Sequence, residues 1–488
     1  MCAGSPETLG QDYQWVPLGS GMGGSAPFVY ALTVYNNDLI AGGLFTTAGG
    51  VACNRIARWN GSTWQSLGSG MNDFVRCLTV YNGELIAGGD FTSAGGVACN
   101  FIARWNGSSW QPLGSGTGSS VLALTVYNGE LIAGGWFWTV GGVGYNCIAR
   151  WSSENGWQPL GSGMGSYVWA VGVYNNELIA GGEFTTAGGV ACNHIARWNG
   201  SVWQALGSGM NNTVKAFTVY DNELIAGGDF TIAGGVSCSG IARWDGSNWQ
   251  PLGSGMGGIS PYVVALTNWN NELIAAGYFA SAGGVTCNRI ARWDGSTWQA
   301  LGSGMNWPVF AVTNWNNELI AGGEFTIAGG VPCNQIARWA PAPGACCYVD
   351  GSCAVTTQAA CTGVWHPEWP DCGVAQCPQV VACCLPSGMC HTLTSAECTA
   401  AGGTPGAAGS DCTPNECPPC VGDLNCDGVV NFGDINAFVL ILSNYALWQQ
   451  TYPGCPSGNG DVDGNGMPGF GDINPFVGLM VQSPLSCE

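Results

Sequence analysis

The chain has 488 residues, enough for several domains, and only 9% of them are charged. The 31 acids outnumber the 11 Lys and Arg, so the formal net charge is -20. This charge repels phosphate, which argues against nucleic acid and anionic membranes as partners and leaves calcium, neutral glycans and other proteins. No apolar run approaches the ~18 residues that a membrane span needs.

Residues 1–12 are expected to form a polar N-terminal tail. Met1 to Gly10 lacks the basic and apolar regions of a signal peptide, so no export signal is expected in the chain as given. Cysteine usage still favours export, because 16 of the 25 cysteines follow residue 340 in a stretch without Lys or Arg. Zinc clusters are the alternative, but adjacent Cys-Cys pairs and few histidines favour disulfides. We therefore expect an extracellular or cell-surface location.

Seven copies of one pattern fill residues 13–340. Each copy has four short apolar runs, separated by turn signals such as Tyr-Asn-Asn and Asn-Gly. A tryptophan stands on each side of the Asn-Gly turn, as Trp105 and Trp110 do, where the two can pack across neighbouring strands. The pattern predicts seven four-stranded antiparallel meanders. The tryptophan that ends each third run recurs every 46 to 49 residues, at Trp59, Trp105, Trp151, Trp198, Trp244, Trp293 and Trp339.

The order of the runs predicts how this region closes. It begins with a fourth run, from Trp15 to Met22, and its last copy stops after the third run at Trp339. The N-terminal strand is therefore expected to complete the last sheet, which gives an all-β, closed, seven-bladed β-propeller. The LIAGG and IARW-NG-W-LGSG motifs resemble kelch-like and bacterial Rax2-type propeller repeats. That resemblance implies the fold, whereas propellers serve both as enzymes and as binding platforms.

An acid opens every second strand, and an arginine lies near the end of every third strand. These ends meet at the same edge of an antiparallel sheet, so we expect one structural ion pair in each blade rather than a ring of binding arginines. The acids are Asp38, Glu84, Glu130, Glu177, Glu223, Glu272 and Glu318, and the arginines are Arg58, Arg104, Arg150, Arg197, Arg243, Arg292 and Arg338. Each blade also has one cysteine, expected to be a buried free thiol. These are Cys53, Cys99, Cys147, Cys192, Cys238, Cys287 and Cys333.

Binding is expected where the copies differ, on the face where the loops before the first strand and between the second and third strands open. Clustered aromatic side chains there suit stacking on sugar rings or a protein contact, although they can equally fill the centre of the ring. The third copy departs most, with Trp136, Trp138 and Tyr145. The other candidate ligand-binding residues are Tyr30, Arg76, Trp169, Lys215 and Phe310.

No catalytic residue is assigned in the repeats. The propeller region has one histidine, His194, so a copper site like that of galactose-oxidase-type kelch enzymes lacks its ligands. A pair of glycosidase carboxylates remains an alternative, because the acids repeated in every blade would conceal it. A non-catalytic protein is the favoured interpretation.

Two copies of a six-cysteine pattern follow an Ala-Pro-Ala-Pro-Gly linker, at residues 341–380 and 381–419. Six cysteines predict three disulfides in each copy, in any of fifteen connectivities. Segments this short cannot bury a sufficient core, so we expect disulfides to hold them as a protease-resistant spacer. The cysteines are Cys346, Cys347, Cys353, Cys361, Cys372 and Cys377 in the first copy, and Cys383, Cys384, Cys390, Cys398, Cys412 and Cys417 in the second.

Residues 420–488 contain two loops with the ligand spacing of an EF-hand. Oxygen ligands at positions 1, 3, 5, 7, 9 and 12 wrap one Ca²⁺, and position 7 binds through its backbone carbonyl. Position 9 of the second loop is Gly469, where water would have to serve. Two calcium sites are expected, each followed by a short helix. Their ligands are Asp423, Asn425, Asp427, Val429, Asn431 and Asp434 in the first, and Asp461, Asp463, Asn465, Met467 and Asp472 in the second.

The tandem loops, each with Asp at position 12, resemble a dockerin. That resemblance implies a small α-helical module that binds a cohesin-like or other scaffold protein in extracellular complexes, many of which degrade glycans. Loop positions 10 and 11, which help to select the cohesin in that family, are Phe432-Gly433 and Phe470-Gly471 instead of small hydroxyl residues. A calcium-stapled C-terminal cap is the alternative. Further disulfides are expected between Cys426 and Cys455 and between Cys420 and Cys487.

These features predict a secreted, non-catalytic binding or scaffold protein. Its propeller would recognise a glycan or a protein, and its dockerin-like module would anchor it through a calcium-dependent protein interaction. One alternative is a glycan-active enzyme, a glycoside hydrolase or lyase, in a polysaccharide-degrading complex. The other is a structural cell-surface or matrix protein.

Overall fold

The computed structural model divides into two compact units, Met1–Ala340 and Pro341–Glu488. The boundary falls at the Ala-Pro-Ala-Pro-Gly linker. The structure describes residues 13–342, 344–348, 353–356, 361–362, 364–366, 372, 380–385, 390–402, 404–406, 421–426, 429–453, 455, 457–481 and 485–486.

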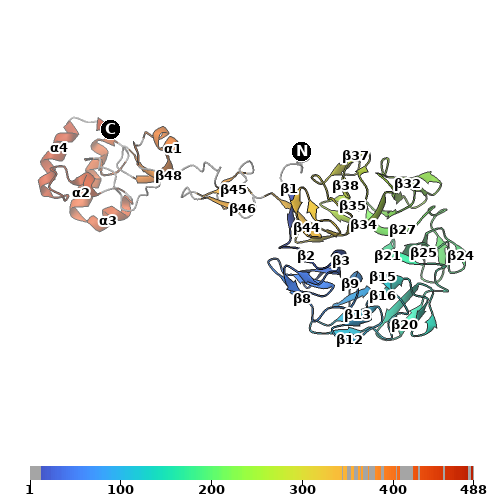
Figure 1. Ribbon diagram of the computed structural model, residues 1–488. Coiled ribbons are helices and arrows are strands. Elements are labelled where there is room, and N and C mark those ends of the chain that lie inside the picture. The colour runs from blue at the N-terminus through green and yellow to red at the C-terminus, as the bar shows by residue number, and fades with distance from the viewer. Residues whose placement is uncertain are drawn as a thin grey trace. The chain divides into compact units, whose positions relative to one another are not determined.

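The first unit is built from four-stranded antiparallel sheets, in which consecutive strands lie side by side. The described residues form seven of these sheets, numbered here as blades 1 to 7 in chain order. Figure 1 shows them following one another around a common centre, with the first strand of each blade innermost. Strand β3 (Phe28–Tyr35) of blade 1 contacts β40 (Val309–Trp315) of blade 7. Strand β1 (Tyr13–Pro17) lies beside β44 (Ile336–Pro341) as the outer strand of blade 7.

The strands begin and end at equivalent residues in every copy of the repeat. The remaining first strands are β9 (Val75–Tyr81), β15 (Val121–Tyr127), β21 (Val168–Tyr174), β27 (Val214–Tyr220) and β34 (Tyr262–Trp269). The second strands are β4 (Asp38–Leu44), β10 (Glu84–Gly89), β16 (Glu130–Gly135), β22 (Glu177–Gly182), β28 (Glu223–Gly228), β35 (Glu272–Tyr278) and β41 (Glu318–Gly323). The remaining third strands are β7 (Ile56–Trp59), β13 (Ile102–Trp105), β19 (Ile148–Ser152), β25 (Ile195–Trp198), β31 (Ile241–Trp244) and β38 (Ile290–Trp293). The remaining fourth strands are β8 (Trp64–Ser66), β14 (Trp110–Pro112), β20 (Gly156–Pro159), β26 (Trp203–Ala205), β32 (Trp249–Pro251) and β39 (Trp298–Ala300).

Each blade also has a short hairpin between its second and third strands, which the sequence pattern does not predict because each hairpin strand has only two residues. In blades 1 and 6 a third short strand, β2 (Met22–Gly23) or β33 (Met256–Gly257), joins the hairpin. The hairpin strands are β5 (Thr47–Ala48), β6 (Val51–Ala52), β11 (Ser93–Ala94), β12 (Val97–Ala98), β17 (Thr139–Val140), β18 (Val143–Gly144), β23 (Thr186–Ala187), β24 (Val190–Ala191), β29 (Ile232–Ala233), β30 (Val236–Ser237), β36 (Ser281–Ala282), β37 (Val285–Thr286), β42 (Ile327–Ala328) and β43 (Val331–Pro332).

The tightest repeated turn joins the first and second strands. In blade 1, Tyr35 pairs with Asp38, and the two intervening asparagines have positive φ angles of 50° and 66°. This is the two-residue turn that suits the twist of a β-hairpin. The Asn-Gly sequence between the third and fourth strands also forms a hairpin, but its loop has four residues, because Trp59 pairs directly with Trp64.

All seven predicted ion pairs are present. In each blade the arginine Nη1 lies 2.8 to 3.7 Å from a carboxylate oxygen of the acid in the neighbouring strand. Six of these arginine side chains are 39–46% exposed, so their charge interactions contribute little to stability. The pair of Arg292 and Glu272 is more buried, with side chains 12% and 13% exposed.

A tryptophan in each fourth strand connects neighbouring blades. Its ring packs on the tryptophan directly across from it, with centroids 5.3 Å apart for Trp59 and Trp64. Its indole N–H donates to a leucine carbonyl of the preceding fourth-strand segment, as from Trp64 to Leu18 at 3.0 Å. This hydrogen bond recurs at all seven tryptophans. The bond from Trp15 to Leu301, at 2.9 Å, joins the two ends of the repeat region.

The predicted buried free thiols are confirmed, and the structure adds an eighth, Cys77 in β9. Burial raises the pKa of every one of these thiols, because an apolar interior disfavours the thiolate. The pKa rises to about 12 for Cys147 and to about 11 for Cys333. These cysteines therefore act as small apolar core residues.

We expect the eight buried thiols to resist alkylation in the folded protein. Their raised pKa keeps them protonated at pH 8, and the reactive thiolate forms only as the pH approaches the raised value. Iodoacetamide treatment of the full chain followed by peptide mass spectrometry should find all eight unmodified, and urea should make all eight reactive. Modification of any of them in the folded protein would contradict their burial.

In the second unit, two small three-stranded sheets carry the cysteine-rich segment. The first cysteine of each copy pairs with the fourth, as Cys346–Cys361 and Cys383–Cys398. The third pairs with the fifth in the first copy, as Cys353–Cys372. Cys377, Cys412 and Cys417 lie outside the described residues. The elements are β45 (Gly344–Cys347), β46 (Cys353–Thr356), β47 (Val364–His366), β48 (Val380–Cys384), β49 (Cys390–Thr394), α1 (Ser395–Ala400) and β50 (Thr404–Pro405).

The C-terminal part of this unit is mostly helical. The rings of Phe438 and Phe476, from two different helices, stack with centroids 4.0 Å apart in its core. The predicted disulfide Cys426–Cys455 is present, whereas Cys420 and Cys487 lie outside the described residues. No helix in the described ranges has the length and hydropathy of a membrane span. The elements are β51 (Val429–Val430), η2 (Phe432–Asp434), α2 (Ile435–Ser443), α3 (Tyr445–Thr451), η3 (Ser457–Gly460), η4 (Phe470–Asp472), α4 (Ile473–Val481) and β52 (Leu485–Ser486).

Candidate functional site

A β-bulge in every first strand positions most of the candidate ligand-binding residues. The pairing between the first and second strands shifts by one residue near the end of the second strand. Bulges redirect a side chain out of the regular alternation of a strand. The residue at the shift is Tyr30, Arg76, Leu122, Trp169, Lys215, Val264 or Phe310 in blades 1 to 7.

The bulge requires the glycine that ends the second strand. A Cβ atom at Gly89 would clash with the carbonyl oxygen of Phe74, which lies just before the bulge in β9. The same clash would occur at Gly182 with Tyr167, so the repeated Gly-Gly sequence has a local structural cause. The sequence predicts the variable residues but not the bulge, although the repeated Gly-Gly pair is a signal of it.

In three blades, the bulge residue is held by the acid that follows the second strand. Arg76 Nη2 lies 2.7 Å from Asp90 Oδ2. Lys215 Nζ lies 2.8 Å from Asp229 Oδ2. In blade 4 the indole N–H of Trp169 donates to the Glu183 carboxylate at 2.9 Å. Sequence reasoning missed these acids, although their position also varies from copy to copy.

The bulge residues of blades 7, 1 and 2 form one aromatic cluster. The rings of Tyr30 and Phe310 stack with centroids 5.2 Å apart. The Arg76 guanidinium lies over the rings of Tyr30 and Phe74, at 4.7 and 4.5 Å from their centroids. Burial raises the pKa of Tyr30, so its phenol stays protonated and can donate a hydrogen bond.

A second aromatic cluster continues through blades 3 to 6. Trp136 packs edge-on against Trp169, with centroids 5.5 Å apart. The Lys215 ammonium lies 5.8 Å from the Trp169 ring and 4.8 Å from the Tyr262 ring. Tyr262 in turn stacks on Tyr278 at 5.6 Å. The structure therefore brings six predicted residues, Tyr30, Arg76, Trp136, Trp169, Lys215 and Phe310, to the same end of the inner strands.

The other two predicted residues of the third copy lie apart from Trp136. The Tyr145 hydroxyl donates to the carbonyl of Trp157 at 2.9 Å, which ties it to the outer strand of its own blade. Trp138 is 48% exposed in the loop before β17. Trp136, Trp138 and Tyr145 of the third copy thus lie in three separate places.

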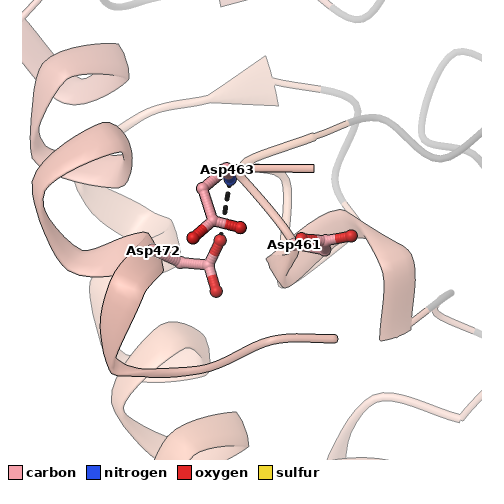
Figure 2. A group of neighbouring side chains, drawn as sticks. All are labelled: Asp461, Asp463 and Asp472. Carbon is pink, nitrogen blue, oxygen red and sulfur yellow. Dashed lines mark hydrogen bonds between the residues drawn. The ribbon is translucent and has the colours of Figure 1, made fainter. Parts of the chain in front are cut away.

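The second of the two loops predicted to bind calcium brings together three carboxylates. Ligand oxygens of Asp461, Asp463 and Asp472 all lie within 4.8 Å of one another. Figure 2 shows Asp463 and Asp472 facing each other, with the Asp463 amide donating to Asp472 Oδ1 at 2.8 Å. The amides of Asn465 and Gly466 donate to Asp461 at 2.9 and 2.7 Å. Gly466, at position 6, has a φ of 99°, which suits the sharp turn of such a loop.

The first predicted calcium loop repeats the hydrogen bonds to the aspartate at position 12. Asp434, at position 12, accepts from the amide of Asn425 at position 3 and from that of Asn431 at position 9. Asp472 accepts in the same way from positions 3 and 9 of the second loop. Asp427 lies outside the described residues. The two loops are therefore built alike, as their matching sequences predict.

The buried charge of these loops is the strongest chemical argument for a cation. The side chains of Asp423, Asp434 and Asp472 are fully buried at 0% exposure. Residues 339–488 contain no Lys or Arg that could neutralise them. The backbone amides that donate to Asp434 and Asp472 stabilise part of this buried charge, and a bound cation would neutralise the rest. The donor set of carboxylates, amide oxygens and a backbone carbonyl fits a hard divalent cation such as Ca²⁺.

An apolar surface, here called the helix face, lies on α2 and α4 next to the loops. A groove of about 240 Å³ is lined only by apolar side chains from these helices and from Phe432. The two loop phenylalanines, Phe432 and Phe470, are 71% and 80% exposed. Exposed apolar surface rimmed by polar residues is typical of a protein interaction site. The groove-lining residues are Phe432, Ile435, Phe438, Ile473, Phe476, Val477, Met480 and Val481.

A family profile supports a β-propeller fold for the first unit. The profile of a family described as "Domain of unknown function (DUF5122) beta-propeller" matches residues 82–108 and 270–293, which lie within its four-stranded antiparallel sheets. No curated protein matches the chain.

Several solved structures resemble the chain distantly. The WD40 beta-propeller domain of Doa1 is 13% identical, with a TM-score of 0.41 over 67% of this chain and 96% of that one. The computationally designed Ika8 protein is 17% identical, with a TM-score of 0.42 over 66% and 99%. The extracellular domain of a hybrid two-component system from B. thetaiotaomicron is 11% identical, with a TM-score of 0.44 over 67% of this chain and 39% of that one.

Proposed function

We propose that the protein is a secreted, non-catalytic binding protein, in which a closed seven-bladed propeller recognises a glycan or a protein and a dockerin-like module anchors it. Ring closure is supported by β1, which lies beside β44, and by the hydrogen bond from Trp15 to Leu301. Secretion is supported by the disulfides of the second unit, which persist in oxidising compartments.

The binding role of the propeller rests on the bulge residues. They differ between blades that are otherwise nearly identical, and they gather aromatic and charged side chains at one end of the inner strands. Aromatic rings fixed by cation–π and ion-pair contacts make preorganised contact surfaces. We also propose that the propeller repeats are related to kelch-like repeats.

The anchoring role rests on calcium. Three fully buried carboxylates in a unit without Lys or Arg carry this part of the proposal. Calcium supplies the positive charge that the buried carboxylates need and so fixes the two loops. The loops in turn fix the start of α2 and α4, because Asp434 and Asp472 directly precede these helices. The helix face is thereby ordered for a cohesin-like or other surface protein.

We expect the helix face to capture its partner only with calcium and only through its exposed phenylalanines. The full chain, immobilised in millimolar calcium, should retain a cohesin-like or other extracellular scaffold protein. Phe432→Asp and Phe470→Asp together should reduce that retention at least tenfold, because each replaces an exposed aromatic ring beside α2 or α4 by a charge. Mass spectrometry of the retained proteins measures the effect.

A matched control is Ile259→Asp, which places the same charge at a residue 87% exposed on the propeller. It should retain the partner as the wild type does. Equal retention by the double phenylalanine variant would refute the helix face as the anchoring surface. Retention that survives EDTA would refute the dependence on calcium.

A further inference from the structure

A pocket opens across blades 5 to 7 at the bulge end of the inner strands. Its volume is about 720 Å³, within the range of roughly 300–1,000 Å³ of small-molecule sites. Blade 5 contributes four lining residues, blade 6 four and blade 7 two. They are Asn212, Lys215, Asp229, Thr231, Ser260, Pro261, Tyr262, Tyr278, Trp307 and Pro308.

The pocket is made by residues that depart from the repeat. Tyr278 is the last residue of β35, and its position is occupied in blades 1 to 5 and 7 by Leu44, Asp90, Trp136, Glu183, Asp229 and Glu324. Trp307, two residues before a buried valine, is replaced in blades 1 to 6 by Pro27, Asp73, Ser119, Ser166, Asn212 and Pro261. The folding of a blade therefore does not require either aromatic residue at its position.

Aromatic rings form the apolar part of the pocket. Trp307 is 52% exposed, so its ring is available to a ligand. Tyr278 is held between the stacked ring of Tyr262 and the Arg289 guanidinium, which lies 5.1 Å from the Tyr278 centroid. Burial raises the pKa of Tyr262, which keeps its phenol protonated as a hydrogen-bond donor. Rings fixed in this way present flat apolar surfaces at little entropic cost.

The polar part of the pocket carries no net formal charge. Lys215 and Asp229 form an ion pair at 2.8 Å, and no other Lys, Arg, Asp or Glu lines the pocket. Side chains of Asn212, Thr231 and Ser260 add an amide and two hydroxyl groups. The lining thus offers many hydrogen-bonding groups but no uncompensated charge for an ionic ligand, and the chain as a whole, at -20, repels anions.

We propose that this pocket binds a neutral saccharide, which gives the recognition function of the propeller a site and a ligand class. This proposal rests on the binding function proposed above. Flat aromatic rings match the C–H face of a pyranose, and the ion pair, amide and hydroxyl groups match its hydroxyls. The pocket lies in blades 5 to 7, whereas the divergent aromatics of blade 3 are divided among separate places.

The test uses the full chain on an array of neutral hexasaccharides of glucose, xylose and mannose, with galacturonate hexasaccharides as the charged comparison. The wild type should bind a neutral saccharide and not the uronate. Trp307→Ala and Lys215→Met should each weaken binding of that saccharide at least tenfold by titration calorimetry. Val202→Ala, which shortens an apolar side chain of similar exposure (53%) beside the fourth strand β26 and away from the pocket, should change it less than twofold. Urea unfolding of each variant verifies that the fold is intact.

The possible results distinguish an error in the assigned pocket from an error in the proposed binding function. If the wild type binds a neutral saccharide and Trp307→Ala binds it equally well, the pocket is refuted while the propeller remains a binding domain. A preference for the uronate, or capture of a protein but no saccharide, overturns the ligand class. Retention of neither saccharide nor protein overturns the proposed function as well.

Discussion

Removing calcium should unfold the C-terminal helices while the propeller stays folded. The buried carboxylates of Asp423 and Asp434 in the first loop and of Asp472 in the second would then lack a neutralising cation in a region that has no Lys or Arg. Calcium present at a thousandfold excess over its dissociation constant stabilises the bound fold by ~4 kcal/mol. Loss of that amount is enough to unfold a small unit whose total stability is of similar size.

Limited proteolysis with chymotrypsin measures this effect, since trypsin has no cleavage sites after Arg338. In EDTA, cleavage is expected at Phe438, Trp448 and Phe476, which are buried in the folded unit. Asp472→Asn should raise the calcium concentration needed for protection at least tenfold. Glu154→Gln, the same charge change at an exposed propeller residue, should leave it unchanged. Cleavage indifferent to EDTA would refute both calcium sites.

Replacing Trp15 by alanine should destabilise the whole propeller by ~3–5 kcal/mol, the usual effect of emptying a buried tryptophan site. Trp15 is 2% exposed, packs on Trp339 with ring centroids 5.2 Å apart, and donates to Leu301. Its loss removes both the packing and the hydrogen bond that joins the two ends of the repeat region. Urea unfolding of the full chain, followed by circular dichroism, measures the change.

Equivalent substitutions in other blades provide the comparison. Trp203→Ala removes a tryptophan of the same role and burial from blade 4 and should have a similar effect. Trp138→Ala, at an exposed site, should change the free energy of unfolding by less than ~0.5 kcal/mol. If Trp15→Ala costs less than ~1 kcal/mol while Trp203→Ala has the full effect, β1 does not hold the ring closed.

Repetition explains why so much of the propeller could be predicted. A residue that recurs at the same position in all seven copies has the same structural role in each blade. The strands, the tryptophan pairs and ion pairs such as Glu84 with Arg104 could therefore be predicted from one aligned pattern. The disulfide Cys426–Cys455 was predicted as well, whereas the pairing within the six-cysteine copies required the structure. Spacing alone does not choose among fifteen connectivities.

The candidate site was predicted only in part, because bulges and pockets depend on contacts between strands. The variable residues Arg76 and Lys215 stood out in the sequence, but their partners Asp90 and Asp229 did not. The third copy was predicted as the main binding region because it has the most aromatic residues. Composition does not reveal that the Tyr145 hydroxyl donates to the outer strand of its own blade. The two calcium sites stay a prediction, made residue by residue because the spacing of such ligands along the chain defines the loop.

The bulge separates what each blade needs to fold from what it presents to a partner. The extra residue stands outside the regular one-to-one pairing of the first and second strands, so its identity can change while the ladder is kept. A propeller of near-identical blades thus has one position per blade that its strand pairing does not fix, although in blades 2, 4 and 5 a neighbouring acid contacts the residue there. A combinatorial library limited to residues 30, 76, 122, 169, 215, 264 and 310 would generate new binding specificities on an unchanged scaffold.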